Sequence, residues 1–390
     1  MNYPEIYLAI DNCFASKRFT KPKEWMQLAA DLGVYHVEAS ADNECDPLYQ
    51  GADYLSRWVD DVQEASVKTG VSVCNLYSGH GTYSTLGLSH TDPQVRDRML
   101  NQWLKPMAAT AGALGAGLGF YCHAFPDSVL QNPAIYQEYY NELIKNLAEI
   151  AGYAQEVGCK SIGLEQMYSP HQIPFTIRGA NDLIHAASEK AKHPIYITLD
   201  SGHASGQRNF LKPDKATIFK ALGDAGKTES ERLWLGCDRA FKLVDGFGNP
   251  GNVGIEGIAD QIIELSESHS YLFAEKQDCS IYSWLEELAC YSPIIHLQQT
   301  DGKVSAHWPF TAARNEIGII EGKKVLEAIK SSFNNPDRSS LPRVDRIYLT
   351  IEVFSSTGSI NYYTLKDLEE TVRYWRQFVP VDGTQPGFVY

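Results

Sequence analysis

The stretch Ile294-Ile-His-Leu-Gln-Gln-Thr-Asp301 starts as an apolar run and ends in a group of polar side chains. Side chains alternate between the two faces of a strand, so His296 and Gln298 would share one face. Three further apolar runs also end in a carboxylate: Ser161-Ile-Gly-Leu-Glu165, Pro194-Ile-Tyr-Ile-Thr-Leu-Asp200 and Arg346-Ile-Tyr-Leu-Thr-Ile-Glu352. Because each run delivers a metal-binding or acid/base group near its carboxyl end, the sequence favours a fold in which many strand ends converge.

The whole chain alternates strand-like and helix-like segments. We expect strands at residues 6–10, 34–38, 71–75, 117–122, 160–165, 195–200, 293–297 and 346–353. Helices with apolar residues at helical spacing are expected at 22–32, 54–69, 92–114, 133–157, 177–192, 280–289, 322–333 and 364–378. Strands that alternate with helices form a parallel sheet. Eight such repeats predict a closed (β/α)8 TIM barrel, with residues 1–390 as a single domain.

An open doubly wound sheet is the alternative architecture. No Gly-x-Gly-x-x-Gly motif follows the first predicted strand, and the chain has no Walker loop. The run Gly112-Ala-Leu-Gly-Ala-Gly-Leu-Gly119 precedes a strand rather than following one, so it indicates a helix end and a tight turn. These observations favour the closed barrel.

The alternation is interrupted between residues 205 and 280, where the chain is polar, rich in glycine and irregular. This segment is much longer than an ordinary connection between a strand and a helix. It follows the sixth strand, which places it on the catalytic face of a barrel. We interpret it as an inserted excursion that serves as a lid, as an oligomerisation contact, or as both.

Composition narrows the class of protein. The 390 residues carry a net charge of -14, which argues against a nucleic-acid or membrane partner. We find no signal peptide, and no apolar run reaches the ~18 residues of a membrane span. The eight cysteines are scattered and form no Cys-x-x-Cys pair. We therefore expect a cytoplasmic protein that acts on a small molecule, with a homo-oligomer left open.

Glu165, Asp200, Gln298 and Glu352 lie at the ends of the last four predicted strands, which are neighbours in a barrel. Carboxylate and carboxamide oxygens are suited to Mn²⁺ or Mg²⁺, and Co²⁺ or Zn²⁺ is compatible with them as well. Taken singly, each residue could be a helix cap or a strand-end ion pair. Four of them at equivalent strand ends predict a shared divalent-metal site.

At this point the chain resembles the xylose isomerase-like TIM barrels, in the branch of sugar-phosphate isomerases and epimerases that includes hydroxypyruvate isomerase and the ketose 3-epimerases. The motifs that carry the resemblance are Gly163-Leu-Glu165, Leu199-Asp-Ser-Gly-His203, Ile295-His-Leu-Gln298-Gln-Thr-Asp301 and Leu349-Thr-Ile-Glu352. The resemblance implies a metal-dependent isomerase or epimerase of a small ketose or ketose phosphate. Proton transfer would pass through a metal-bound enediolate, with Glu165 and Glu352 as the catalytic acid/base pair.

The resemblance also implies individual roles. Glu165, Asp200 and Glu352 fall on metal ligands, and His203 falls on a residue that contacts substrate. After strand seven the epimerases usually place a histidine ligand, whereas hydroxypyruvate isomerase places a glutamine. We favour Gln298 because an acidic residue follows three positions later, with His296 as the competing ligand or a substrate contact. The long excursion and the missing arginine after Asp301 depart from the family pattern.

Further substrate contacts are weaker candidates. Glu38, His123 and His307 follow or end predicted strands, and Lys303 is a candidate for a phosphate contact. Asn75 and His80 follow the third strand. Two other functions stay open: a non-catalytic sugar-binding barrel, and a metal-dependent hydrolase resembling endonuclease IV. The sequence leaves open which sugar is bound, whether the reaction is isomerisation or epimerisation, and which metal is used.

Overall fold

The protein is described here by a computed structural model that covers residues 3–79, 86–223, 233–246, 254–335, 341–356 and 358–386. His80 lies outside the described residues. Among the described residues, none of the helices combines the length and the apolar character that crossing a membrane requires.

Eight parallel strands form a closed barrel in which every strand pairs with its neighbours in chain order. The first strand pairs with the last from Glu5–Arg346 to Ile10–Ile351, and this pairing closes the barrel. The strands are β1 (Glu5–Asp11), β2 (His36–Ser40), β3 (Ser72–Ser78), β4 (Gly117–Phe120), β5 (Ile162–Glu165), β6 (Tyr196–Asp200), β7 (Ile294–Leu297) and β8 (Arg346–Ile351). The predicted TIM barrel is confirmed.

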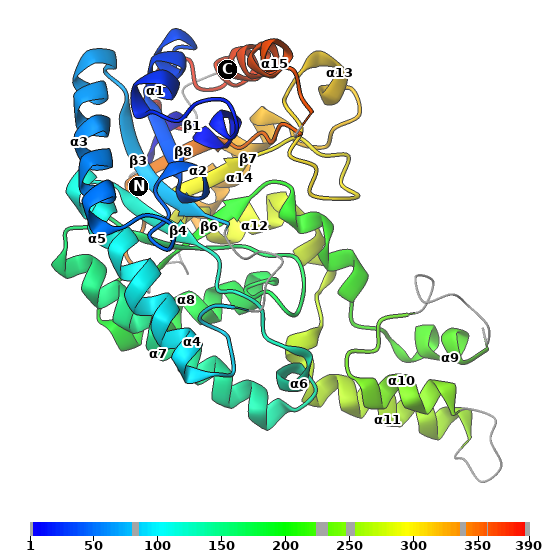
Figure 1. The fold of residues 1–390 in the computed structure, drawn as a ribbon. Helices are drawn as coiled ribbons and strands as arrows, with labels where there is room; N and C mark the ends of the chain where they lie inside the picture. The colour runs from blue at the N-terminus through cyan, green and yellow to red at the C-terminus, as the bar shows by residue number, and fades with distance from the viewer. Residues whose placement is uncertain are drawn as a thin grey trace.

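An outer ring of helices surrounds these strands, as Figure 1 shows. Its members are α1 (Pro22–Asp31), α3 (Ala52–Thr69), α4 (Pro93–Met99), α5 (Lys105–Leu114), α7 (Pro133–Glu156), α8 (Ile177–Ala191), α12 (Ile281–Leu288), α14 (Gly322–Asn334) and α15 (Asn361–Trp375). Three short helices lie in the loops: α2 (Ala41–Glu44), α6 (Asp127–Leu130) and α13 (Ala312–Asn315). Proline near the first helical position begins α1, α4 and α7, where its missing N–H costs nothing.

Alternation along the strands divides apolar from polar side chains. In β6, Ile197 and Leu199 are fully buried in the apolar core, and Thr198 and Asp200 alternate with them. Glycine on the neighbouring strand makes room for this polar row, because a Cβ at Gly163 would lie 2.6 Å from the Thr198 hydroxyl. The same alternation brings the acidic strand ends to one end of the barrel.

The excursion between β6 and β7 is more regular than the sequence indicated. It contains α9 (Lys215–Gly223), α10 (Asp238–Asp245) and α11 (Ile255–Ser268), which extend as an arm from one side of the barrel in Figure 1. The expectation of an irregular segment was therefore wrong: α11, for example, buries Ile258 and Ile262 on one face. At the base of the arm, Lys212 N donates to Ala274 O at 3.1 Å, so the chain leaves and returns at neighbouring points.

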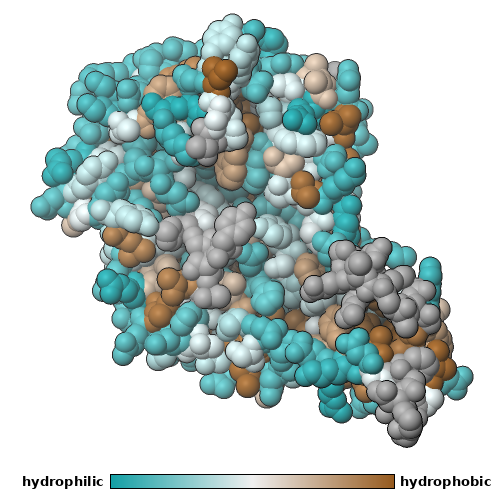
Figure 2. Space-filling view, turned by 45° about the vertical axis from the view of Figure 1, so that its right-hand side comes forward, coloured by the Kyte–Doolittle hydropathy of each residue, from teal (hydrophilic) through white to brown (hydrophobic). Residues whose placement is uncertain are grey.

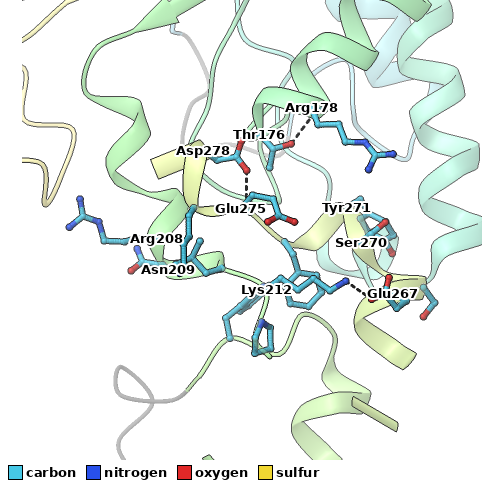
Figure 3. A pocket seen from close by; sticks show the side chains of 18 of the residues that line it. Thr176, Arg178, Arg208, Asn209, Lys212, Glu267, Ser270, Tyr271, Glu275 and Asp278 are labelled. Carbon is cyan, nitrogen blue, oxygen red and sulfur yellow. Dashed lines mark hydrogen bonds and ion pairs between the residues drawn. The ribbon is translucent and has the colours of Figure 1, made fainter. Parts of the chain in front are cut away.

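A groove of about 2200 Å³ separates the arm from α7 and α8. Figure 3 shows that charged and aromatic side chains line the groove, among them Arg178 and Tyr271. Lys212 Nζ and Glu267 Oε1 form an ion pair there at 2.6 Å. In the view of Figure 2 the arm carries more hydrophobic surface than the barrel face beside it. The lining comes from α7, α8 and residues 208–278 rather than from the strand ends, so this large groove is separate from the acidic cluster.

Candidate metal centre and its surroundings

Three carboxylates surround one imidazole nitrogen at the carboxyl ends of β5 to β8. Nδ1 of His296 lies 3.3 Å from Glu165 Oε1, 3.6 Å from Glu352 Oε2 and 3.9 Å from Asp200 Oδ2. Glu165 and Glu352 are 4% exposed, and Asp200 and His296 are fully buried. The strand register explains the convergence, because Asp200 pairs with His296, and Glu165 and Asp200 are the last residues of their strands.

A fourth carboxylate, that of Glu38, fixes the orientation of His296 through the other ring nitrogen. Nε2 of His296 lies 2.6 Å from Glu38 Oε1, and Asn75 Nδ2 donates to Glu38 Oε2 at 2.7 Å. Since a carboxylate only accepts, Nε2 carries a proton and donates it to Glu38, and Nδ1 is left facing the three other carboxylates. Glu38, a predicted substrate contact, is fully buried and holds the imidazole by this hydrogen bond.

The neighbouring side chain, Gln298, has a different environment. Its carboxamide oxygen accepts from the backbone N–H of His307 at 2.6 Å, and its Nε2 donates to Asp200 Oδ1 at 2.8 Å. The amide orientation follows from these partners, because only the oxygen can accept from an N–H and only the nitrogen can donate to a carboxylate. The geometry therefore favours His296 over Gln298 as the ligand from β7, which reverses the order of preference drawn from the sequence.

The segment after β6 is built around Asp200. Oδ1 of Asp200 accepts from the backbone N–H of Gly202 at 2.6 Å and of His203 at 3.1 Å. Burial acts to raise the pKa of Asp200, but His203, His307 and His296 outweigh it and lower the pKa to about 2. His203 Nδ1 donates to Gln166 O at 2.6 Å, so in the neutral ring Nε2 is the acceptor, 4.0 Å from Asp200 Oδ1.

His307 stands beside Glu352 at the rim. Its Nδ1 lies 3.4 Å from Glu352 Oε2, and its ring stacks on Phe354 with centroids 4.0 Å apart and planes 7° apart. His307 adopts a φ of 46°, which a non-glycine residue rarely does and which positions the ring. Burial raises the pKa of Glu352 even though His296 and His307 act to lower it.

The electrostatics of the cluster fit a divalent cation. Burial opposes a charged imidazole, but the carboxylates of Glu38 and Glu352 and the hydrogen bond with Glu165 hold the pKa of His296 well above its usual value. The cluster thus favours positive charge at the point that Nδ1 faces. Oxygen ligands with one imidazole suit Mn²⁺, and they are compatible with Mg²⁺, Co²⁺ or Zn²⁺. The residues that would hold the ion are Glu165, Asp200 and His296, with Glu352 beside them from an overlapping group that contains Asp200 and His307.

Two other predicted substrate contacts are His123 and Lys303, whose surroundings the structure shows. The ring of His123 is fully buried, packs 4.7 Å from the Tyr121 ring, and accepts from the backbone N–H of Leu88 at 3.3 Å. The Lys303 side chain is 80% exposed and lies 3.7 Å from Asp301 Oδ2. The sequence interpretation also missed Tyr77, whose hydroxyl donates to Glu165 Oε2. Tyr77 lies just beyond the strand predicted at residues 71–75, and a single tyrosine there carries no signal that separates it from a core aromatic residue.

Comparison with solved structures places the fold among sugar isomerases and epimerases. A protein described as a candidate xylose isomerase from Rhodospirillum rubrum matches with a TM-score of 0.66 and 17% identity, over 95% of this chain and 98% of the other. An L-ribulose 3-epimerase matches with a TM-score of 0.54 and 14% identity, over 96% and 93% of the two chains. A D-psicose 3-epimerase from Clostridium cellulolyticum H10, in a structure with D-tagatose, matches with a TM-score of 0.51 and 11% identity, over 96% and 97%.

The sequence itself shows the family. The family model described as xylose isomerase-like TIM barrel matches residues 26–232, which is more than half of the 390 residues. The chain belongs to this family, as its strand-end motifs predicted. A search of curated proteins finds no match.

Proposed function

We propose that the protein is a divalent-metal-dependent isomerase or epimerase of a small ketose or ketose phosphate. The observation that carries the proposal is the His296 Nδ1 atom with carboxylate oxygens of Glu165, Glu352 and Asp200 within 3.3 to 3.9 Å. This buried arrangement has the composition of a catalytic metal site that keeps positions for substrate oxygens. The structural likeness to ketose epimerases supports the choice of substrate class.

The two glutamates are the acid and base in this proposal. Bound metal supplies Lewis acidity, which makes the hydrogen beside a substrate carbonyl acidic. Glu165 and Glu352 come from different strands and approach the centre from different sides. If one glutamate removes the proton and the other returns a proton to the opposite face of the same carbon, the product is an epimer. Return at the neighbouring carbon gives an isomer.

Other side chains bind and enclose the substrate. His203, through its Nε2 atom, is placed to hydrogen-bond a sugar oxygen, because its Nδ1 is committed to Gln166 O. His307 and Phe354 form a stacked wall beside Glu352 and limit the access of water. Neither His203 nor the pair of His307 and Phe354 requires a phosphate on the substrate. A test of the proposal therefore needs both free and phosphorylated ketoses.

Incubation with a panel of pentuloses, hexuloses and their phosphates in D₂O tests the proposal. With Mn²⁺, we expect NMR to show deuterium beside the carbonyl, or a new epimer or aldose, and we expect a chelator to abolish the change. Full turnover by rigorously metal-free protein would contradict the metal dependence. Ketose binding without exchange or product would indicate a non-catalytic sugar-binding barrel and would contradict the proposed activity.

A further inference from the structure

The two oxygens of Glu165 have separate partners. The hydroxyl of Tyr77 donates to Oε2, whereas Oε1 faces Nδ1 of His296 at 3.3 Å. Tyr77 is 6% exposed and Glu165 is 4% exposed, so water does not readily replace either partner. A hydrogen bond to an ionised, buried carboxylate is stronger than one between neutral groups, and it restricts rotation of the carboxylate.

The ring of Tyr77 also contacts the candidate histidine ligand. Its centroid lies 4.9 Å from that of His296, and the two planes meet at 89°. His296 is therefore held by Glu38 at Nε2 and by an aromatic ring at its side. One residue on β3 thus contacts two of the side chains that would hold the ion.

Gly119 on the neighbouring strand leaves the space that the ring of Tyr77 occupies. Tyr77 pairs with Gly119 across β3 and β4, and a Cβ at position 119 would lie 3.0 Å from Tyr77 Cδ2. That distance is tighter than an ordinary carbon contact, so any larger residue at 119 would displace the ring. The position of the tyrosine hydroxyl is consequently set by the packing of the barrel interior.

Glu352 has imidazole partners instead of a hydroxyl. Its Oε2 faces two imidazole nitrogens, that of His296 at 3.6 Å and that of His307 at 3.4 Å. The two glutamates are therefore unlike in their surroundings, although one ends β5 and the other directly follows β8.

We propose that Tyr77 is a positioning residue that holds Glu165 as a one-oxygen metal ligand. The inference rests on the proposed function, because it assigns a task within the same site. Tyr77 acts through Glu165 and His296 and does not itself contact the reacting carbon. Loss of an outer partner of a metal ligand typically weakens metal binding by ~10–100-fold.

Mn²⁺ titration of the full chain, followed by EPR and calorimetry, tests this role without a known substrate. We expect Tyr77→Phe to keep the fold and to bind Mn²⁺ ~10–100-fold more weakly than the wild type. Tyr282→Phe is the matched control, since its hydroxyl bonds Ile319 O at 2.9 Å on the outside of the barrel, and its affinity should be unchanged. Gly119→Ala, which keeps the hydroxyl but moves the ring, should show a smaller loss.

A double-mutant cycle with Glu165→Gln shows whether the tyrosine acts through the glutamate. We expect Tyr77→Phe to cost much less affinity in the Glu165→Gln background, because the partner is no longer charged. Equal Mn²⁺ affinity of Tyr77→Phe and wild type, or fully additive losses in the cycle, would overturn the role of Tyr77. Absence of Mn²⁺ binding by the wild type would instead contradict the proposed function.

Discussion

The two halves of the barrel make different contributions to one site. Strands β5 to β8 supply Glu165, Asp200, His296 and Glu352, whose oxygens and ring nitrogen face one another. Strands β2 and β3 supply Glu38, which contacts His296, and Tyr77, which contacts Glu165, and Asn75 in turn donates to Glu38. Under the proposed function, one half of the barrel would carry out the chemistry and the other half would fix its geometry.

Removal of an acid/base group from the β5–β8 half should have the largest effect. We expect Glu165→Gln and Glu352→Gln to fold, because each keeps an oxygen, and to lose turnover by ~10²-fold or more. Initial rates of ketose conversion, with circular dichroism as the check on folding, measure this. Near wild-type rates in both variants would show that the two carboxylates are structural. That result would contradict the assignment of the chemistry to strands β5 to β8.

A substitution in the β1–β4 half should act through metal affinity. Glu38→Gln removes the charge that holds Nε2 of His296 at 2.6 Å, and we expect Mn²⁺ affinity to fall by ~10–100-fold. At saturating Mn²⁺, turnover should recover to a large extent, because Glu38 is fully buried below the imidazole. Glu267→Gln, which affects only an arm contact with Lys212, is the control. A turnover defect that persists at saturating metal would give Glu38 a direct role in catalysis.

Removal of the arm should have the smallest effect on the metal centre. Residues 213–272 can be replaced by a short linker, because Leu211 and Ala274 already pair at the base of the arm. We expect a folded barrel with Mn²⁺ affinity within ~2-fold of wild type, since no ligand residue is removed. A raised KM would support a lid, and a changed native mass would support an oligomer contact. If the KM and the native mass were both unchanged, the arm would be neither a lid nor an oligomer contact.

The fold and the acidic strand ends could be predicted because local sequence determines them. An apolar run that ends in Glu165 or Asp200 shows both the strand and the position of its functional group. The tasks of Glu38 and Tyr77 could not be predicted, because they depend on partners 258 and 88 residues away. The choice between His296 and Gln298 also needed the tertiary structure, since both lie on the same face near the end of β7.

The helices of the arm were missed for a different reason. Glycine-rich and polar stretches interrupt the apolar pattern between residues 205 and 280, and α11 is stabilised by packing against other arm residues as well as by its own amphipathic face. His123 looked functional because it follows β4. Its ring is buried beside Tyr121 and Trp103, surroundings that chain position alone does not reveal, and its contact with substrate stays a prediction.

Pulsed EPR of the Mn²⁺-loaded protein is the most direct test of the proposed metal centre. We predict one bound ion per chain and a nitrogen coupling from a single imidazole in the wild type. That coupling should disappear in His296→Gln. It should persist in Gln298→Ala, because Gln298 directs its amide nitrogen rather than its oxygen at Asp200. No stoichiometric Mn²⁺ binding, or an unchanged nitrogen coupling in His296→Gln, would contradict the account.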